Sequence, residues 1–294
     1  MDTGFLANLL LVVDSGSMAE AARRIGVTPA AIAQQVQALE RELGVSLLVR
    51  AGRTVIPTEA GHRVIEKARA LVRDTAELKA VALTDEPSGE LRVGTITTAL
   101  LSLLPDVLAG FSNAFPQAQV LIRAGTSMEL YETLQRGELD VAICLHPPFA
   151  LPKAYEWHLL REEPIVLLAP TALAEIDPHT LLQREPFIRY DRSLGGGKQA
   201  DQYLRAAKIV PHELFELNSL MAIAMMVDRR LGVSLVPDIV SPLTANLNIV
   251  RLPLPAPVER RRFGLLWHRA SPRARLIKGL MHCSEAVLAR ENHG

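Results

Sequence analysis

The sequence has few cysteines, no net charge and no long apolar run. These absences argue against a cysteine metal site, a strongly basic nucleic-acid binder and a membrane protein, respectively. Its two cysteines, Cys144 and Cys283, belong to no Cys-x-x-Cys pair, so we expect two reduced thiols and no metal site. The 32 Lys and Arg residues balance the 32 Asp and Glu residues. If the chain binds nucleic acid, its positive charge must therefore be local.

Targeting and membrane signals are also missing. The N-terminal apolar stretch at residues 9–13 follows no Lys or Arg and ends at Asp14, so it lacks the length and the basic start of a signal peptide. No apolar run approaches the roughly 18 residues that a membrane span needs. We therefore expect a cytoplasmic protein without a membrane partner. Its 294 residues predict two or three domains.

The pattern divides the chain into three segments. Residues 1–57 contain short helices and a tight loop, residues 58–83 form one long helix, and residues 85–89 have the composition of a linker. In residues 90–294, helical stretches separate strand-like apolar runs at 91–94, 120–122, 141–143, 165–168, 187–188, 233–236 and 263–267. This alternation predicts an α/β fold with mostly parallel sheets that are buried on both faces. The length predicts two subdomains, one at about 90–164 and 268–294 and the other at about 165–267.

The first segment has the signals of two helices joined by a short turn. Ser17 begins a capping box that closes at Glu20 and opens a helix at residues 18–24. Gly26 suits the left-handed turn, and Thr28 and Pro29 suit the cap and first position of the next helix. This order predicts a helix-turn-helix motif whose second helix enters the major groove.

Residues 47–56 predict a β-hairpin wing with a glycine in its turn. Glutamines on the second helix can pair with adenine, and arginines on the wing can hold phosphates. The expected DNA-binding residues are Ser17, Thr28, Pro29, Ala30, Gln34, Gln35, Gln37, Arg50, Arg53 and Thr54. Five arginines and five acidic residues cancel within residues 1–57, so we expect affinity for DNA to depend on dimerisation.

The long helix carries a repeat that predicts a partner helix. Spacings of four and three residues alternate along it, which is the period of a coiled-coil seam. The expected dimer contacts are Val64, Ala68, Leu71, Thr75 and Leu78. The alternative is an amphipathic helix that packs on its own domain.

Residues 5–61 closely resemble the N-terminal signature of LysR-type transcriptional regulators. The matching stretches are 16–22 (GSMAEAA), 39–45 (LERELGV), Arg50 and 57–61 (PTEAG), and the resemblance continues at 104–105, 137–143 and 231–237. It implies a winged helix-turn-helix domain at 1–57, a dimerisation helix and hinge at 58–89, and a two-subdomain α/β sensor at 90–294 that resembles periplasmic binding proteins. It also implies a homodimer or homotetramer that binds double-stranded DNA and a small-molecule effector.

Ligands of open α/β sheets bind beyond the carboxyl ends of strands, and free amides at helix starts favour anions. The resemblance implies that the loop after the first sensor strand lines the effector pocket. The expected effector-binding residues are Thr97, Thr98, Gly125, Thr126, Ser127, His146, Arg189, Tyr190 and Asn218. Arg189 would supply the charge for a small carboxylate. The alternatives are helix capping for the threonines, a structural role for His146 and a solvated strand end for Arg189.

Two other functions fit part of the sequence. A solute-binding protein explains residues 90–294 but leaves the first 83 unused, and an α/β enzyme lacks a catalytic constellation. Gly195–Lys198 (GGGK) resembles a phosphate loop, but such a loop needs Gly in place of Arg192 and Ser or Thr in place of Gln199. We therefore predict a transcriptional regulator controlled by a small anion, without cofactor and not an enzyme.

Overall fold

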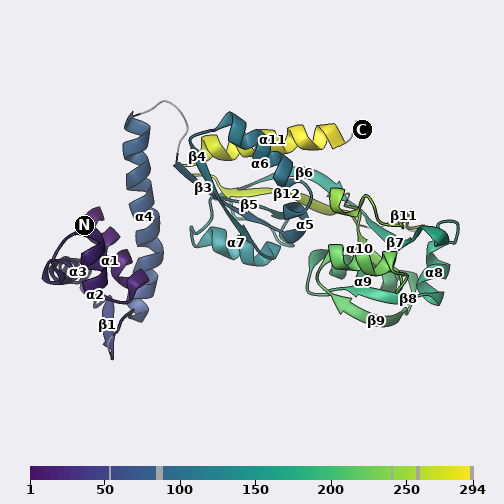
Figure 1. Cartoon of the computed structure of the whole chain (residues 1–294), viewed down its shortest axis with the longest axis horizontal. Helices are drawn as coiled ribbons and strands as arrows, with labels where there is room; N and C mark the ends of the chain where they lie inside the picture. Colours follow the sequence, from purple (N-terminus) through teal and green to yellow (C-terminus); the bar gives the residue numbers. More distant parts are fainter. Residues whose placement is uncertain (53, 84–88, 240, 256–258, 292–294) are drawn as a thin grey trace.

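The computed structural model describes residues 1–52, 54–83, 89–239, 241–255 and 259–291. A small helical domain, a long helix and a larger α/β domain follow one another along the molecule (Figure 1). The predicted linker falls outside the described residues except for Gly89, and the predicted wing residue Arg53 lies outside them as well.

The N-terminal domain has the predicted helices and wing. Its elements are α1 (Thr3–Ser15), α2 (Met18–Ile25), α3 (Pro29–Leu43), β1 (Leu48–Ala51) and β2 (Thr54–Pro57), the two strands pairing as an antiparallel hairpin. The hydroxyls of Ser17 and Thr28 cap α2 and α3, and Gly26, with φ of 71°, ends α2 as predicted. One detail was wrong: the Glu20 carboxylate does not reach back to Ser17 but pairs with Arg23 and Arg24, which lie one turn further along α2.

The long helix α4 (Glu59–Leu83) is anchored on this domain by its first half. Ile65 and Ala68 are buried in the same core as α1, and Val64 packs against that core. Gly61 allows the close approach, because a Cβ there would lie 2.0 Å from the carbonyl oxygen of Leu47. The seam prediction is therefore corrected at Ala68, which is buried within its own chain, whereas Val64 is only half-buried there and its dimer contact stays a prediction.

The second half of α4 carries exposed apolar side chains. Leu71 and Leu78 remain 44% and 70% exposed. The Thr75 hydroxyl donates to the Leu71 carbonyl oxygen at 2.8 Å, a bond within the helix. Leu71 and Leu78 are thus the apolar positions of the predicted seam that stay exposed among the described side chains.

Subdomain I of the sensor is a five-stranded sheet in the order β4-β3-β5-β12-β6. Its strands are β3 (Gly89–Thr95), β4 (Ala118–Ala124), β5 (Val141–Leu145), β6 (Tyr155–Glu163) and β12 (Arg261–His268), and its helices are α5 (Thr97–Leu100), α6 (Leu104–Ala114), α7 (Ser127–Gln135) and α11 (Ala274–Glu291). Figure 1 shows α6 and α11 along one side of the sheet and α7 on the other. Both sides contribute to one apolar core.

Subdomain II is built around β7, whose apolar run is buried on both faces. Ile165, Leu167 and Ala169 face one core while Val166 and Leu168 face another. Its strands are β7 (Ile165–Pro170), β8 (Pro186–Tyr190), β9 (His212–Leu217), β10 (Ser234–Pro237) and β11 (Ile249–Pro253), and its helices are η1 (Thr171–Leu173), α8 (Pro178–Arg184), α9 (Gly195–Ala207), α10 (Leu220–Asp228) and η2 (Pro242–Thr244). A parallel bridge between Phe187 and Val233 joins β8 to β10.

Two predictions about the sensor were wrong. Strand β12 pairs with β5 and β6, so residues 261–267 belong to subdomain I and not to subdomain II. The sheets are also mixed, because β12 runs antiparallel to both its neighbours and β7 runs antiparallel to β10 and β11. An apolar run indicates a buried strand but carries no information about which sheet it joins or in which direction.

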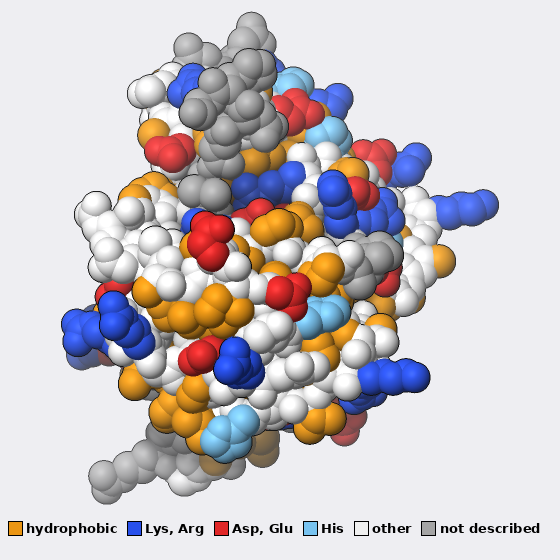
Figure 2. Space-filling model, turned by 90° about the vertical axis from the view of Figure 1, so that its right-hand side faces the viewer, with side chains coloured by type: hydrophobic (Ala, Val, Ile, Leu, Met, Phe, Trp, Pro, Cys, Tyr) orange, Lys and Arg blue, Asp and Glu red, His pale blue; other side chains and the backbone are white. Residues whose placement is uncertain are grey.

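Charge is intermixed on the one face of the molecule that Figure 2 shows. On the end of the molecule that lies at the right of Figure 1, basic and acidic side chains alternate with hydrophobic and uncharged ones (Figure 2). No helix of the described residues is long and apolar enough to cross a membrane.

Candidate functional site

The outward face of α3 is the candidate DNA-reading surface. Ala30, Gln34 and Gln37 are exposed at spacings of four and three, so they share one side of the helix. Opposite them, Ile32, Val36 and Leu39 are buried in the domain core. Thr28 and Pro29 begin the helix and are exposed as well.

Two of the predicted contact residues are tied to the domain itself. The Gln35 side-chain oxygen accepts from Asn8 Nδ2 on α1 at 2.6 Å, so this amide faces the domain. The Ser17 hydroxyl caps α2. On the wing, Arg50 is exposed, and the Thr54 hydroxyl donates to the Ala51 carbonyl oxygen at 3.0 Å across the hairpin turn. Among the predicted contact residues that the structure describes, Gln34, Gln37 and Arg50 therefore have long polar side chains that are exposed and form no hydrogen bond with other described residues.

A cavity of about 880 Å³ lies between the two sensor subdomains. The chain passes between the subdomains twice, from β6 to β7 and from β11 to β12, and Glu259 and Arg260 of the second connection line the cavity. Eight of the nine predicted effector residues line it, namely Thr97, Thr98, Gly125, Thr126, Ser127, His146, Tyr190 and Asn218. Volumes of this order hold small organic molecules.

On the wall formed by subdomain I, several polar groups already have partners. The Thr126 hydroxyl and the Glu129 carboxylate form a capping box at the start of α7, and the Thr126 amide holds the pKa of Glu129 below its usual value. The Ser127 hydroxyl accepts from the Leu145 amide at 3.1 Å. His146 Nδ1 lies 2.6 Å from the Pro147 carbonyl oxygen.

The threonines that follow β3 have fewer hydrogen-bond partners among the described residues. Thr97 begins α5, and the cap position before it is Ile96, which offers no side-chain acceptor. Neither Thr97 nor Thr98 therefore acts as the cap of this helix, which was the alternative reading. Their hydroxyls form no hydrogen bond with other described residues and so can serve a ligand, while the Thr98 carbonyl oxygen accepts from the Ser102 hydroxyl.

On the wall formed by subdomain II, Tyr190 is buried and burial raises the pKa of its phenol. Asn218 is exposed to the cavity. Ser219, the next residue, caps α10 by accepting from the Ala222 amide at 3.2 Å. This wall therefore offers a neutral phenol and an amide.

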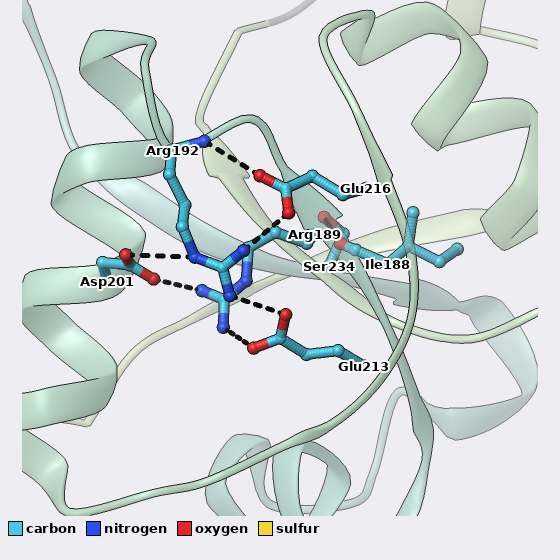
Figure 3. A network of polar contacts seen from close by, with 7 residues as sticks. All are labelled: Ile188, Arg189, Arg192, Asp201, Glu213, Glu216 and Ser234. Atoms are coloured by element: carbon cyan, nitrogen blue, oxygen red, sulfur yellow. Dashed lines mark hydrogen bonds and ion pairs between the residues drawn. The ribbon is translucent and has the colours of Figure 1, made fainter.

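Arg189, the ninth predicted residue, does not line the cavity. It is 3% exposed and forms ion pairs with Asp201 on α9 and Glu213 on β9 (Figure 3). Its guanidinium also lies 4.9 Å from the centre of the Phe187 ring. Both readings of Arg189, as a ligand of the effector and as a solvated strand end, are therefore wrong.

Arg192 completes the network of Figure 3. Its guanidinium lies 2.7 Å from Glu213 and 2.6 Å from Glu216. Hydrogen bonds from Arg189 and then Arg192 hold the pKa of Glu213 below its usual value, against the opposing effect of partial burial. The network joins β8, α9 and β9, and so fixes the position of α9 beside the cavity.

The cations of the cavity were missed by the sequence analysis. Five basic residues line it, namely Lys198, Arg251, Arg260, Arg261 and Arg262, against two carboxylates, Glu129 and Glu259. Lys198 belongs to the GGGK stretch that was set aside as an imperfect phosphate loop. The run of three arginines at 260–262 was the other available signal.

Comparison with known proteins agrees with both halves of the fold. Residues 5–62 match the model of the bacterial regulatory helix-turn-helix protein, lysR family, and residues 84–289 match the LysR substrate binding domain. The HTH-type transcriptional regulator YnfL of Escherichia coli is 29% identical over 283 residues, covering 92% of this chain and 94% of YnfL.

Two solved structures share the whole architecture. A full-length OxyR variant from Pseudomonas aeruginosa has a TM-score of 0.70 and 26% identity, covering 97% of this chain and 94% of that one. Full-length CbnR complexed with its target DNA has a TM-score of 0.62 and 23% identity, covering 96% of this chain and 100% of that one. With a DNA-binding helix-turn-helix at one end and an effector-binding domain at the other, the chain belongs to the LysR family of transcriptional regulators.

Proposed function

We propose that this regulator responds to a small anion held in the cavity between subdomains I and II. The observation that carries the proposal is the charge of the cavity wall, where five basic side chains face two carboxylates although the whole chain is neutral. Polar groups from both subdomains line the same cavity. A ligand that touches both walls stabilises their closed arrangement, which is what a switch requires.

The remaining parts of the proposal concern assembly and place of action. Leu71 and Leu78, which are exposed on α4, support a homodimer through this helix, and a homotetramer would need further contacts. The dimer would bind double-stranded DNA in the cytoplasm through two copies of α3 and the wing. The effector would be bound and released without chemical change, so the protein would not act as an enzyme.

The test has two parts on the full-length protein. Genomic fragments retained by the protein are sequenced, and fluorescence anisotropy measures affinity for a retained fragment. A thermal-shift screen of small organic acids then identifies a stabiliser, and anisotropy is repeated with it. We expect at least one acid to raise the melting temperature and to change the affinity for DNA. A screen in which only neutral or cationic compounds stabilise the protein would refute the anion.

A further inference from the structure

Three helices of the sensor with nine or more residues begin at the cavity wall, and one of them is uncapped. Thr126 caps α7 and Ser219 caps α10 through side-chain oxygens. The cap position of α9 is Leu194, which offers no side-chain acceptor. The first amides of a helix have no intrahelical carbonyl, so the start of α9 keeps its donors and its positive dipole end.

A buried cation in the same wall has one donor without a partner among the described residues. The Arg261 side chain is 5% exposed, and its Nε pairs with Glu163. Its Nη2 is buried and has no hydrogen-bond partner among the described residues. Glu163 is itself 2% exposed and is shared with Arg161, whose Nε lies 2.8 Å away. Arg261 therefore keeps one unused donor among the described residues.

Contacts between the two elements bring Arg261 and the start of α9 together. Gln199 Nε2, in the second turn of α9, donates to the carbonyl oxygen of Glu259 at 2.9 Å. Tyr190 adjoins both parts: a Cβ on Gly196 would lie 2.7 Å from its ring, and the charge of Arg261 acts on its phenol. Gly195, Lys198 and Arg261 all line the cavity.

A carboxylate lies elsewhere on the cavity wall. Glu129 stands at the start of α7, where the Thr126 amide holds its pKa below its usual value, and its charge compensates the dipole of that helix. Lys198 and Arg251 lie on subdomain II, Arg260 on the returning connection, and Arg261 and Arg262 at the start of β12 in the sheet of subdomain I. The cavity therefore takes its cations from subdomain II and from the start of β12, and carries a carboxylate at the start of α7.

We infer that the anionic group of the effector, a carboxylate or a phosphate, binds at the start of α9 between the Gly195 amide, Lys198 and Arg261. The Thr98 hydroxyl on α5 and the start of α7 at Ser127 then face an uncharged polar part of the ligand. This inference rests on the proposed function and adds to it the location and orientation of the charged group.

Isothermal titration of the full-length protein with inorganic phosphate and with acetate, at matched ionic strength, tests the inference. We expect saturable binding of at least one anion to the wild type, and the anion that binds identifies the source of the charge. Lys198→Gln, at an exposed position, should weaken that binding about tenfold, because it removes one charge-assisted contact. Arg261→Gln should weaken it at least as much. If Arg261→Gln folds poorly, Lys198→Gln alone decides.

Two controls locate the anion. Lys153→Gln makes the same change at an exposed lysine outside the cavity and should leave binding within twofold of the wild type. Thr98→Val, at the other wall, should also leave phosphate and acetate binding unchanged. The inference fails if neither anion binds saturably, if Lys153→Gln weakens binding as much as Lys198→Gln, or if Thr98→Val weakens it while Lys198→Gln does not. DNA retention by the wild type is measured in a separate experiment. If the wild type did not retain DNA, that result would count against the proposed function and not against the anion site.

Discussion

Asn8 and Gln35 join α1 to α3 through a side-chain hydrogen bond of 2.6 Å, donated by Asn8 Nδ2. The bond turns Gln35 toward its own domain. Its neighbour Gln34 is exposed and lies on the face of α3 that carries Ala30 and Gln37. The two adjacent glutamines, which the sequence analysis treated alike, therefore have different surroundings.

Gln34→Ala should change the sequence preference of the protein, with a loss of about 1–3 kcal/mol on the preferred site. Gln35→Ala should instead lower the free energy of unfolding by about 1 kcal/mol and leave the order of preferred sites unchanged. Binding to a library of retained fragments measures preference, and urea denaturation measures stability. A change of preference in Gln35→Ala alone would contradict the assignment.

Arg50→Ala should weaken binding to all sequences to a similar degree. Arg50 is exposed on β1 of the wing, a position from which we expect it to contact phosphates, which position the protein without reading sequence. The slope of log affinity against log salt should fall by about one unit. Arg229→Ala is the matched control, at an exposed arginine of the sensor. If Arg50→Ala alters preference and not the salt slope, the wing reads sequence instead.

Leu78→Glu should shift the protein toward monomer and weaken DNA binding. Leu78 and Leu71 are the exposed apolar positions of the predicted seam, and a carboxylate there would be buried against its copy in a dimer. Analytical ultracentrifugation measures the shift. Lys67→Glu, an exposed position on the same helix, is the control that should sediment like the wild type. An unchanged profile in both Leu71→Glu and Leu78→Glu would exclude α4 as the main contact.

The N-terminal domain was predictable because its signals are local. Ser17, Gly26, Thr28 and Pro29 act within one helical turn of their own positions, so spacing alone sets the helix ends. The seam on α4 was less predictable, since Ala68 looks the same whether it faces a partner or α1. Its contact depends on the tertiary fold and not on the period of the helix.

The error at Arg189 has a physical reason that the sequence already contained. Successive side chains of a strand point to opposite faces. Phe187 and Tyr190 lie in different cores, and Arg189 shares the face of Phe187. Arg189 and Tyr190 could therefore not both face the cavity. What the sequence did not contain was the return of β12 to the first sheet, which carries Arg261 into the cavity wall.

Arg189→Ala should destabilise the sensor by about 3–5 kcal/mol, because removing one member of a buried ion pair leaves its partners uncompensated. Asp201 and Glu213 would then share Arg192 alone. Arg192→Ala, at a residue whose side chain is 44% exposed, should cost less than about 1 kcal/mol. Urea denaturation of both variants gives the comparison. Equal midpoints for Arg189→Ala and the wild type would show that the network does not hold the subdomain together.

Glu213 predicts how this network responds to pH. Its pKa in the folded protein is lowered, first by the hydrogen bond from Arg189 and then by that from Arg192, while partial burial opposes them. A group whose folded pKa lies below its unfolded value stabilises the fold fully above the unfolded pKa, about 4.3 for glutamate. That contribution decreases as pH falls through the folded pKa.

The difference in unfolding free energy between the wild type and Glu213→Gln should therefore be constant at neutral pH and decrease below about pH 4. Urea denaturation over a pH series measures it, with Glu162→Gln, an exposed carboxylate outside the network, as the matched control. A difference that grows as the solution is acidified would mean that Glu213 is not held in its charged form by the two arginines.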